Sequence, residues 1–260
     1  MKEFENNLPE NFAPPEITSA KIDVPRRKIL EGLEEKLGVQ FKNLELLNVA
    51  LTHTSFANEM RHDKQEIFDH NEKLEFLGDA VLELASSTFL FNYFKNFSEG
   101  ELTKTRATIV CQATLAKIAK QFGLGDLLLL SNGEAASGGR NRESTLEDAF
   151  ESIIGAIYLD SGWEVARDFI FRILVPECER VKAGDVPKDY KGTLQEFIQR
   201  KPGGVIEYIE VSSSGPDHMK IFEHAVKVDG KILGKGTGRS KKIAEQNAAK
   251  EALKKLNVKV

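Results

Sequence analysis

Five carboxylates lie in two apolar stretches of the sequence. They are Glu72, Glu75 and Asp79 within NEKLEFLGDAVLEL, and Asp148 and Glu151 directly before SIIGAIYL. Carboxylate oxygens are hard ligands, and a cluster of them without His or Cys suits Mg²⁺, with Mn²⁺ as a substitute, rather than zinc. Such an ion polarises a phosphoryl oxygen and activates water for an in-line displacement. The pattern therefore points to phosphodiester hydrolysis, provided that both stretches meet at one site.

The first stretch separates cleanly into two faces when it is drawn as a helix. At 100° per residue, Asp79 lies about 20° and Glu75 about 60° from Glu72, while the aliphatic residues lie on the opposite side. Most acidic helix stripes are simply solvated, and acid pairs at this spacing are common, so a solvated face remains the alternative. However, the apolar Phe76 and Leu82 border the acids, and something is expected to cover them.

Two kinds of domain are expected to position these residues. Apolar residues recur three and four positions apart through residues 25–181, which predicts a helical bundle. The expected helices are RRKILEGLEEKLGV, NLELLNVALTHTS, residues 71–95, SEGELTKTRATIVCQATLAKIAKQFG, TLEDAFESIIGAIYLDSG and WEVARDFIFRILVPECERV. Residues 1–24 are expected to be a flexible leader and residues 182–187 a polar linker. Residues 188–260 change to an α-β-β-β-α pattern, with Asp229-Gly230 as a hairpin turn. The fold class is therefore an all-α domain followed by a small α+β domain.

The charge of the chain is unevenly distributed. The 260 residues have a net charge of −4, yet residues 188–260 hold 15 Lys and Arg against 9 Asp and Glu, a net charge of +6. A basic small domain beside an acidic larger one suggests a polyanion-binding module attached to a part that uses carboxylates.

No apolar run nears the roughly 20 residues of a membrane helix, and no secretory h-region is visible. Cys111 and Cys178 suit neither a disulfide framework nor a metal knuckle. We expect a cytoplasmic protein without a membrane partner or a small-molecule cofactor.

The acid-bearing stretches also resemble a known family. NEKLEFLGDAVL looks like the signature motif of ribonuclease III, and EDAFESIIGAIYLD resembles that family's second acidic segment; LTHTSFANE, GELTKTRA and SGGRNRES follow the family's order. The resemblance covers about residues 28–181. It implies that Glu75, Asp79, Asp148 and Glu151 bind the catalytic metal, with Asp79 and Glu151 central to catalysis, and that Glu72 lies at the edge of the active site. It also implies a homodimer in which Phe76 enters a pocket of the other subunit.

Two further acids lie near this expected site. Glu147 adds a charge beside Asp148 where related sequences often have a small apolar residue. Because adjacent helix residues are about 100° apart, Glu147 is expected to point away from the metal. Glu83, a turn beyond Asp79, is expected to be structural.

The loop GKGTGRSKK places Lys241 and Lys242 in the first turn of the last expected helix, after the N-cap Ser240. The helix dipole disfavours cations there, whereas glycines and free N–H groups favour a phosphate. DYKGTLQEF, GPDHMKIF and GRSKKIAEQNAAKEAL together resemble the double-stranded-RNA-binding domain over residues 188–257. By this resemblance, RNA is contacted by Gln195, Glu196, Gln199, His218, Lys241 and Lys242. Gly192 departs from a pattern that often has a hydroxyl residue there.

The two resemblances imply one function, a homodimeric, Mg²⁺-dependent endoribonuclease specific for double-stranded RNA. Its products would have 5′-phosphate and 3′-hydroxyl ends with short 3′ overhangs, and its substrates would include ribosomal precursor and other structured RNAs. One alternative is a non-catalytic RNA-binding protein, in which at least one of the four acids would be missing. Another is a metal-dependent DNA nuclease or phosphohydrolase, which would leave the C-terminal module unexplained.

Overall fold

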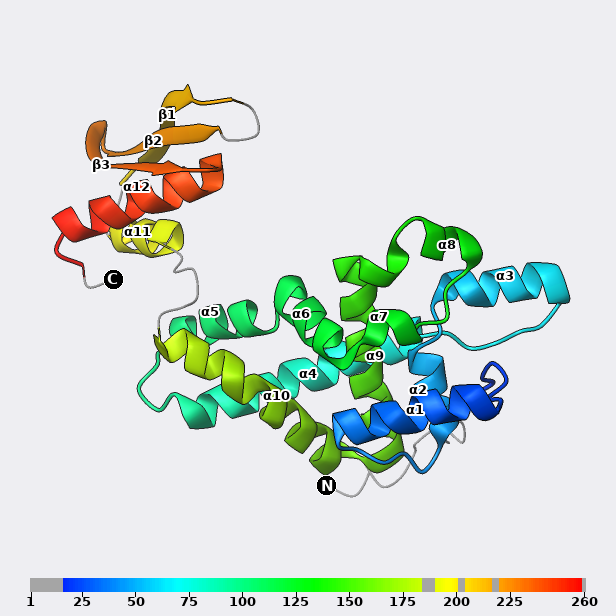
Figure 1. Cartoon of the computed structure of the whole chain (residues 1–260). Coiled ribbons are helices and arrows are strands. Elements are labelled where there is room, and N and C mark those ends of the chain that lie inside the picture. The colour runs from blue at the N-terminus through cyan, green and yellow to red at the C-terminus, as the bar shows by residue number, and fades with distance from the viewer. Residues whose placement is uncertain (1–15, 184–189, 201–203, 217–219, 259–260) are drawn as a thin grey trace, which may run out of the picture. The chain divides into compact units, whose positions relative to one another are not determined.

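The structure of the chain is a computed structural model that describes residues 16–183, 190–200, 204–216 and 220–258. The chain divides into two compact units, Met1–Asp185 and Val186–Val260 (Figure 1). The first unit is helical, and the second combines two helices with a three-stranded sheet. The predicted fold class is thereby confirmed. Within the described ranges, no helix is both long and apolar enough to cross a bilayer.

The first unit contains ten α-helices in its described residues. They are α1 (Val24–Leu37), α2 (Leu44–Ala50), α3 (Thr54–Lys64), α4 (Glu72–Tyr93), α5 (Glu99–Ile109), α6 (Gln112–Phe122), α7 (Leu124–Leu127), α8 (Asn132–Ala136), α9 (Glu143–Ser161) and α10 (Trp163–Ala183), with a 3₁₀ turn, η1 (Gly139–Asn141), before α9. Local signals explain several boundaries. The Asp23 side chain caps α1, which ends at Gly38 in the left-handed conformation, and Ser98 with Glu101 forms a capping box at the start of α5.

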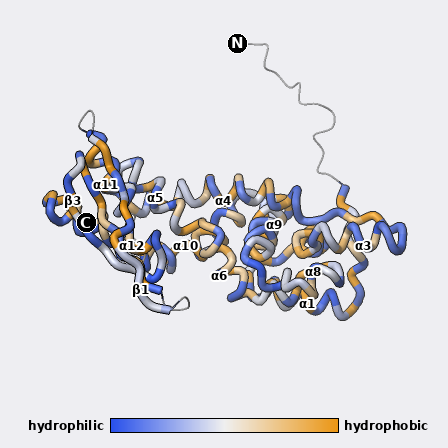
Figure 2. Tube along the Cα trace, turned by 90° about the horizontal axis from the view of Figure 1, so that it is seen from above, coloured by the Kyte–Doolittle hydropathy of each residue, from blue (hydrophilic) through white to orange (hydrophobic). Residues whose placement is uncertain are grey.

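Helices α4 and α9 form the centre of this unit and pack against each other more extensively than any other pair of helices. The side chains of Phe150, Ile153, Ile154 and Ile157 on α9 are completely buried. Helices α2, α6 and α10 also pack against α9. Hydrophobic and hydrophilic segments alternate along these helices (Figure 2), as expected for helices that each present one face to a shared core.

Two of the expected helices are each broken in the structure. The segment 98–123 forms α5 and α6, because Cys111 has an extended backbone (φ −77°, ψ 157°) and its carbonyl oxygen accepts the first hydrogen bonds of α6. The segment 43–55 also contains two helices. Helix α2 ends at Ala50, and α3 begins at Thr54, where the ring nitrogen of His53 accepts a hydrogen bond from the first turn. Hydrophobic periodicity continues through both breaks, which is why it did not predict them.

The predicted flexible leader is too long at its C-terminal end. Residues 1–15 lie outside the described residues, but Ala20 is buried, and Ile17 and Ile22 pack against the core. The backbone N–H of Thr18 donates to the Asp69 carboxylate, and the backbone N–H of Asp69 donates to the Thr18 carbonyl. The carbonyl of Ala20 accepts a bond from the Asn48 side chain. The leader therefore ends in an ordered segment before α1. Of the predicted linker, Lys182 and Ala183 belong to α10, and residues 184–187 lie outside the described residues.

The second unit contains α11 (Tyr190–Gln199), β1 (Ile206–Ser214), β2 (Ile221–Val228), β3 (Lys231–Gly238) and α12 (Lys241–Lys255). The strands pair antiparallel in the order β1-β2-β3. Asp229 and Gly230 both have positive φ, as the predicted hairpin turn requires, and Ser240 caps α12 as predicted. Leu194 of α11 and Ala248, Ala249, Ala252 and Leu253 of α12 form one core with Val226 of β2.

Candidate active site and RNA-binding surface

Helix α4 presents its predicted acids on the side opposite to its core face. Glu72 and Asp79 are exposed and Glu75 is half-buried, whereas Leu74 and Val81 are buried. Phe76 stands beside the acids with 81% of its surface exposed. The predicted acidic face is present, and the single chain leaves Phe76 uncovered as expected. The prediction was wrong for two leucines: Leu82 is only 1% exposed and is covered within the chain, whereas Leu84 is 57% exposed.

Helix α9 supplies the second acid pair from within the core. Asp148 and Glu151 are both half-buried, and Ala149, Phe150 and Ser152, which flank them, are buried. Because the neighbours of these two acids are packed on all sides, the backbone that carries the acids is held in place. This is the burial pattern of a helix that positions side chains at the edge of a core.

Two glycines bring the acid-bearing helices into main-chain contact. A Cβ atom on Gly78 of α4 would lie 1.8 Å from the carbonyl oxygen of Glu151, and a Cβ atom on Gly155 of α9 would lie 2.2 Å from that of Leu74. No side chain larger than hydrogen fits at either position without displacing a helix. Gly78 lies between Glu75 and Asp79 in sequence, so the crossing point of the helices places both acid pairs in one region.

Neither glycine featured in the sequence-based site. Glycine within a helix costs roughly 1 kcal/mol relative to alanine, so its presence there calls for a packing reason. The glycine in each acid-bearing segment could have indicated that the two predicted helices are in close contact.

The carboxylates interact electrostatically across the helix crossing. Burial, followed by the charges of Asp79, Glu147, Glu75 and Asp148, raises the pKa of Glu151 to about 8. Burial and then the charge of Asp148, with smaller effects from the other neighbouring acids, raises the pKa of Glu75 to about 7. Burial is also the main cause that raises the pKa of Asp79 and of Asp148. Acids of α4 thus raise the pKa of an acid of α9, and acids of α9 raise the pKa of an acid of α4.

Glu147 and Glu83 also contribute to this negative field. The carboxylate of Glu147 accepts a hydrogen bond of 2.7 Å from the Gln112 side chain of α6, and its charge raises the pKa of Glu75, Asp148 and Glu151. Glu83 acts in the same way on Asp79. Glu147 and Glu83 therefore both raise the pKa of carboxylates at the helix crossing.

The donor types at the crossing fit a hard divalent cation. The interacting groups are all carboxylates, which are oxygen ligands of the kind that Mg²⁺ prefers, and their raised pKa values mark a place where positive charge would be stabilising. In the described part of the chain, however, no three His, Cys, Asp or Glu side chains are already arranged so that they could hold a metal ion. The backbone thus brings the oxygen donors to one region, but their side chains are not arranged as the ligands of a metal ion.

The second unit presents the polar residues expected to contact RNA. Gln195, Glu196 and Gln199 are exposed on α11, on the side away from the buried Leu194. Lys241 and Lys242 are exposed in the first turn of α12. Lys241 forms an ion pair of 2.7 Å with Glu210 of β1. His218 lies outside the described residues.

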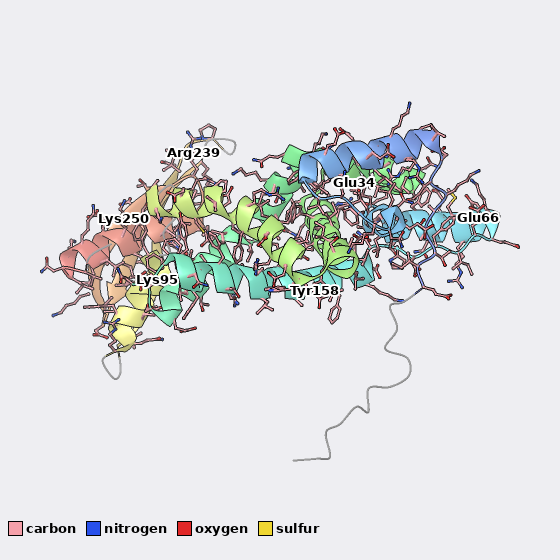
Figure 3. The ribbon with its side chains drawn as sticks, turned by 90° about the horizontal axis from the view of Figure 1, so that it is seen from below. Glu34, Glu66, Lys95, Tyr158, Arg239 and Lys250 are labelled. Atoms are coloured by element: carbon pink, nitrogen blue, oxygen red, sulfur yellow. The ribbon has the colours of Figure 1, made fainter. Side chains whose placement is uncertain are left out.

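Two further basic side chains belong to α12 and the turn before it. Arg239, between β3 and α12, is exposed, and Lys250 of α12 lies with its Nζ 5.3 Å from the centroid of the Tyr190 ring. Both side chains are labelled in Figure 3. At the start of α12, the exposed Arg239, Lys241 and Lys242 thus form a basic surface of the kind that binds phosphates.

The glycines of GKGTG have a packing role that the sequence interpretation missed. Cβ atoms on Gly234 and Gly236 would lie 2.2 Å from backbone atoms of Ala248, and one on Gly238 would lie 2.7 Å from the backbone nitrogen of Ala244. Helix α12 therefore rests directly on strand β3, with alanine on one side and glycine on the other. This contact fixes the position of the helix that carries Lys241 and Lys242.

Comparison with known proteins agrees with this description. Residues 43–178 match the family described as Ribonuclease-III-like, and residues 190–256 match the double-stranded RNA binding motif. Ribonuclease 3 of Streptococcus gordonii is 47% identical over 233 residues, which cover 89% of this chain and 98% of that protein. Ribonuclease 3 of Clostridium tetani is 44% identical and covers 88% of this chain and 95% of that protein.

Solved structures give the same answer for the first unit. A crystal structure of the nuclease domain of ribonuclease III from Campylobacter jejuni matches with a TM-score of 0.51 and 44% identity, covering 56% of this chain and 94% of that chain. The match of the nuclease unit and of the RNA-binding unit in one continuous chain means that this protein belongs to the ribonuclease III family.

Proposed function

We propose that this protein is a double-strand-specific endoribonuclease whose active site is the crossing of α4 and α9. One observation carries the proposal: Gly78 and Gly155 allow the two acid-bearing helices to touch, which brings Glu75 and Asp79 to Asp148 and Glu151. The attached double-stranded RNA binding fold supplies the substrate class. A purely RNA-binding protein would have no need for half-buried carboxylates that raise one another's pKa.

Glu75, Asp79, Asp148 and Glu151 would hold Mg²⁺, or Mn²⁺ as a substitute, with Glu72 at the edge of the site. A bound divalent ion supplies charge neutralisation at the phosphate and activates water for hydrolysis. The residues of the chain contribute a fixed set of oxygen donors, and their raised pKa values make deprotonation and cation binding mutually dependent. Asp79 and Glu151 would be central to catalysis; after burial, the charge of Asp79 is the largest cause that raises the pKa of Glu151.

The second unit would hold the duplex through its A-form shape. Gln195, Glu196 and Gln199 would contact 2′-hydroxyls and base edges in the minor groove, while Lys241 and Lys242 would contact phosphates. His218, by resemblance, would contact a neighbouring groove. Ribosomal precursor RNA and other structured transcripts in the cytoplasm are the substrates we propose.

The functional unit would be a homodimer. Phe76, Leu84 and Phe91 of α4 are 81%, 57% and 69% exposed, so three large apolar side chains of this helix are uncovered on the single chain. A Campylobacter jejuni relative has been described with structural flexibility in a region involved in dimer formation of the nuclease domain. Insertion of Phe76 into a second copy would cover this surface and supply one active site for each strand of the duplex.

The proposal is tested by cleavage of matched duplexes. Duplex RNA, duplex DNA and an RNA–DNA hybrid of one sequence are incubated with the full chain in Mg²⁺ and in chelator, and the ends of the products are determined. We expect cleavage of duplex RNA alone, only with Mg²⁺, to give 5′-phosphate and 3′-hydroxyl ends with short 3′ overhangs. Cleavage of duplex DNA would favour a general nuclease, and RNA binding without cleavage would favour a binding protein.

The site assignment needs its own variant. Glu151→Gln is expected to keep duplex affinity and lose cleavage, whereas Glu143→Gln, in the exposed first turn of the same helix, is expected to cleave normally. Multiple-turnover cleavage by Glu151→Gln would refute the role of Glu151.

A further inference from the structure

Helix α9 contributes a buried hydroxyl immediately after Glu151. The Ser152 side chain is completely buried, and its Oγ donates a hydrogen bond of 3.1 Å to the backbone carbonyl of Asn71. Asn71 is the residue before α4, and only 2% of its surface is exposed. A buried side chain of one acid-bearing helix is thus bonded to the main chain at the start of the other.

The acceptor of this bond is shared with one of the acids. The backbone N–H of Glu75 donates to the same Asn71 carbonyl at 2.8 Å, which forms the first turn of α4. The Asn71 N–H in turn donates to the carbonyl of Thr52 at 2.9 Å, so Asn71 is also anchored to the rest of the unit. One carbonyl therefore connects the main chain of Glu75 to the residue adjacent to Glu151.

This bond adds a constraint that the glycine contacts do not provide. Gly78 and Gly155 permit the helices to approach, but a contact between backbones allows one helix to slide or rotate against the other. A directional hydrogen bond at the N-terminal end of α4 fixes the register, because its strength falls steeply with misalignment. A change in register would move Glu75 relative to Glu151.

We propose that Ser152 is a positioning residue that sets the separation of the two acid pairs and so the affinity of the site for a divalent cation. The proposal rests on the proposed function, because it assumes that these acids bind the metal. Groups outside the ligand set that orient the ligands commonly alter metal affinity by about 10- to 100-fold when they are removed.

The chain offers a matched control for a purely structural effect. Ser86 of α4 is also completely buried, and its Oγ donates a bond of 3.1 Å, but to the Glu83 carbonyl of its own helix. Ser152→Ala and Ser86→Ala thus each remove a buried hydroxyl and one hydrogen bond of equal length. In Ser152→Ala the Asn71 carbonyl keeps the bond from Glu75, so a deep loss of stability is not expected.

The test measures Mn²⁺ binding to the full chain without RNA, by electron paramagnetic resonance of the free ion, together with thermal unfolding in chelator. We expect Ser152→Ala to raise the dissociation constant by about 10-fold and Ser86→Ala to leave it within about 2-fold of the unmodified protein, while both lower the unfolding temperature to a similar extent. Equal Mn²⁺ affinity in Ser152→Ala and the unmodified protein would overturn the proposal, as would an equal loss in Ser86→Ala.

Two further variants separate the possible failures. Glu151→Gln must lose Mn²⁺ affinity if the acids bind metal; if it binds as the unmodified protein does, the proposed metal site fails, and the role of Ser152 fails with it. If Glu151→Gln loses affinity but Ser152→Ala does not, only the positioning role is refuted. Should Ser152→Ala not fold, Ser152→Cys, which keeps the size and offers a weaker donor, replaces it with the same criteria.

Discussion

Gly78 lies against Glu151 so closely that a Cβ atom on the glycine would be 1.8 Å from the carbonyl oxygen of the glutamate. The residue that would bind the metal is thus part of the contact that closes the core. The contacts at Gly78 and Gly155 therefore affect both the stability of the unit and the arrangement of the acids.

Gly78→Ala is expected to reduce the free energy of unfolding by about 1–3 kcal/mol, because the added methyl group forces the helices apart. Cleavage should fall more than stability alone explains, since the acid pairs separate. Gly100→Ala is the control: nothing lies within 4 Å of a Cβ there, so this helical position should be unaffected or slightly stabilised. Urea denaturation and single-turnover cleavage measure both effects; unchanged values for Gly78→Ala would contradict the described helix contact.

The stability of the metal-free protein should fall as the pH rises. The pKa of Glu75 is raised to about 7 and that of Glu151 to about 8, so the folded state retains protons that the unfolded state has released. Their contribution to stability is present below the unfolded pKa of about 4.5 and is lost as the pH passes through 7 and 8. Unfolding temperatures in chelator between pH 5 and pH 9 test this. Glu151→Gln should show a weaker decline than Glu143→Gln, and equal declines would contradict the assignment.

Glu210 is expected to weaken RNA binding by holding Lys241 in an ion pair of 2.7 Å. Exposed pairs contribute about 0.2–1 kcal/mol, so Glu210→Gln should increase duplex affinity by about 1.5- to 5-fold. Glu207, like Glu210, lies on β1, and its carboxylate is 4.0 Å from Lys227 of β2, so Glu207→Gln is the matched control. Duplex RNA affinity, measured in chelator over a range of salt concentrations, tests this prediction. A lower affinity of Glu210→Gln would contradict it and would mean that the ion pair holds Lys241 in its RNA-binding position.

Gly236→Ala should disrupt the second unit by moving α12 away from β3, because its Cβ would meet the backbone nitrogen of Ala248 at 2.2 Å. We expect duplex affinity to fall and hydrogen exchange in α12 to accelerate, with exchange in α4 and α9 unchanged. The adjacent Thr237 is exposed, so Thr237→Ala should leave both properties near normal. Slow exchange in α12 of Gly236→Ala would contradict the close packing.

Phe76→Ala should shift the protein from dimer to monomer, because this side chain, which is 81% exposed on the single chain, would lose its pocket in the second copy. Sedimentation velocity over a range of protein concentrations measures the shift. Ile67, which is 69% exposed outside α4, provides the control in Ile67→Ala. A monomeric unmodified protein would refute the dimer itself.

The sequence was sufficient to predict the fold of both units and the limits of the longest helices, α4, α9 and α10, because amphipathic periodicity, caps and turn residues are local signals. It did not reveal the breaks at Cys111 and His53, where the Cys111 carbonyl and the His53 ring accept the first hydrogen bonds of a new helix although the apolar pattern continues. It also did not reveal why Gly78, Gly155 and the β3 glycines are present. Their reason is the close approach of a segment distant in sequence, which no local pattern contains.

The ordered end of the leader has a consequence for the acid helix. Thr18 and Asp69 exchange two hydrogen bonds of 2.8 Å, and Asp69 is two residues before Asn71, which begins the turn into α4. Proteolytic trimming to Val24 would keep Glu72, Glu75, Asp79, Asp148 and Glu151, yet it would remove both bonds to Asp69 and the Asp23 cap of α1. We expect the shortened protein to lose some stability and to lose support for the segment that leads into α4, which is distant in sequence from the cut.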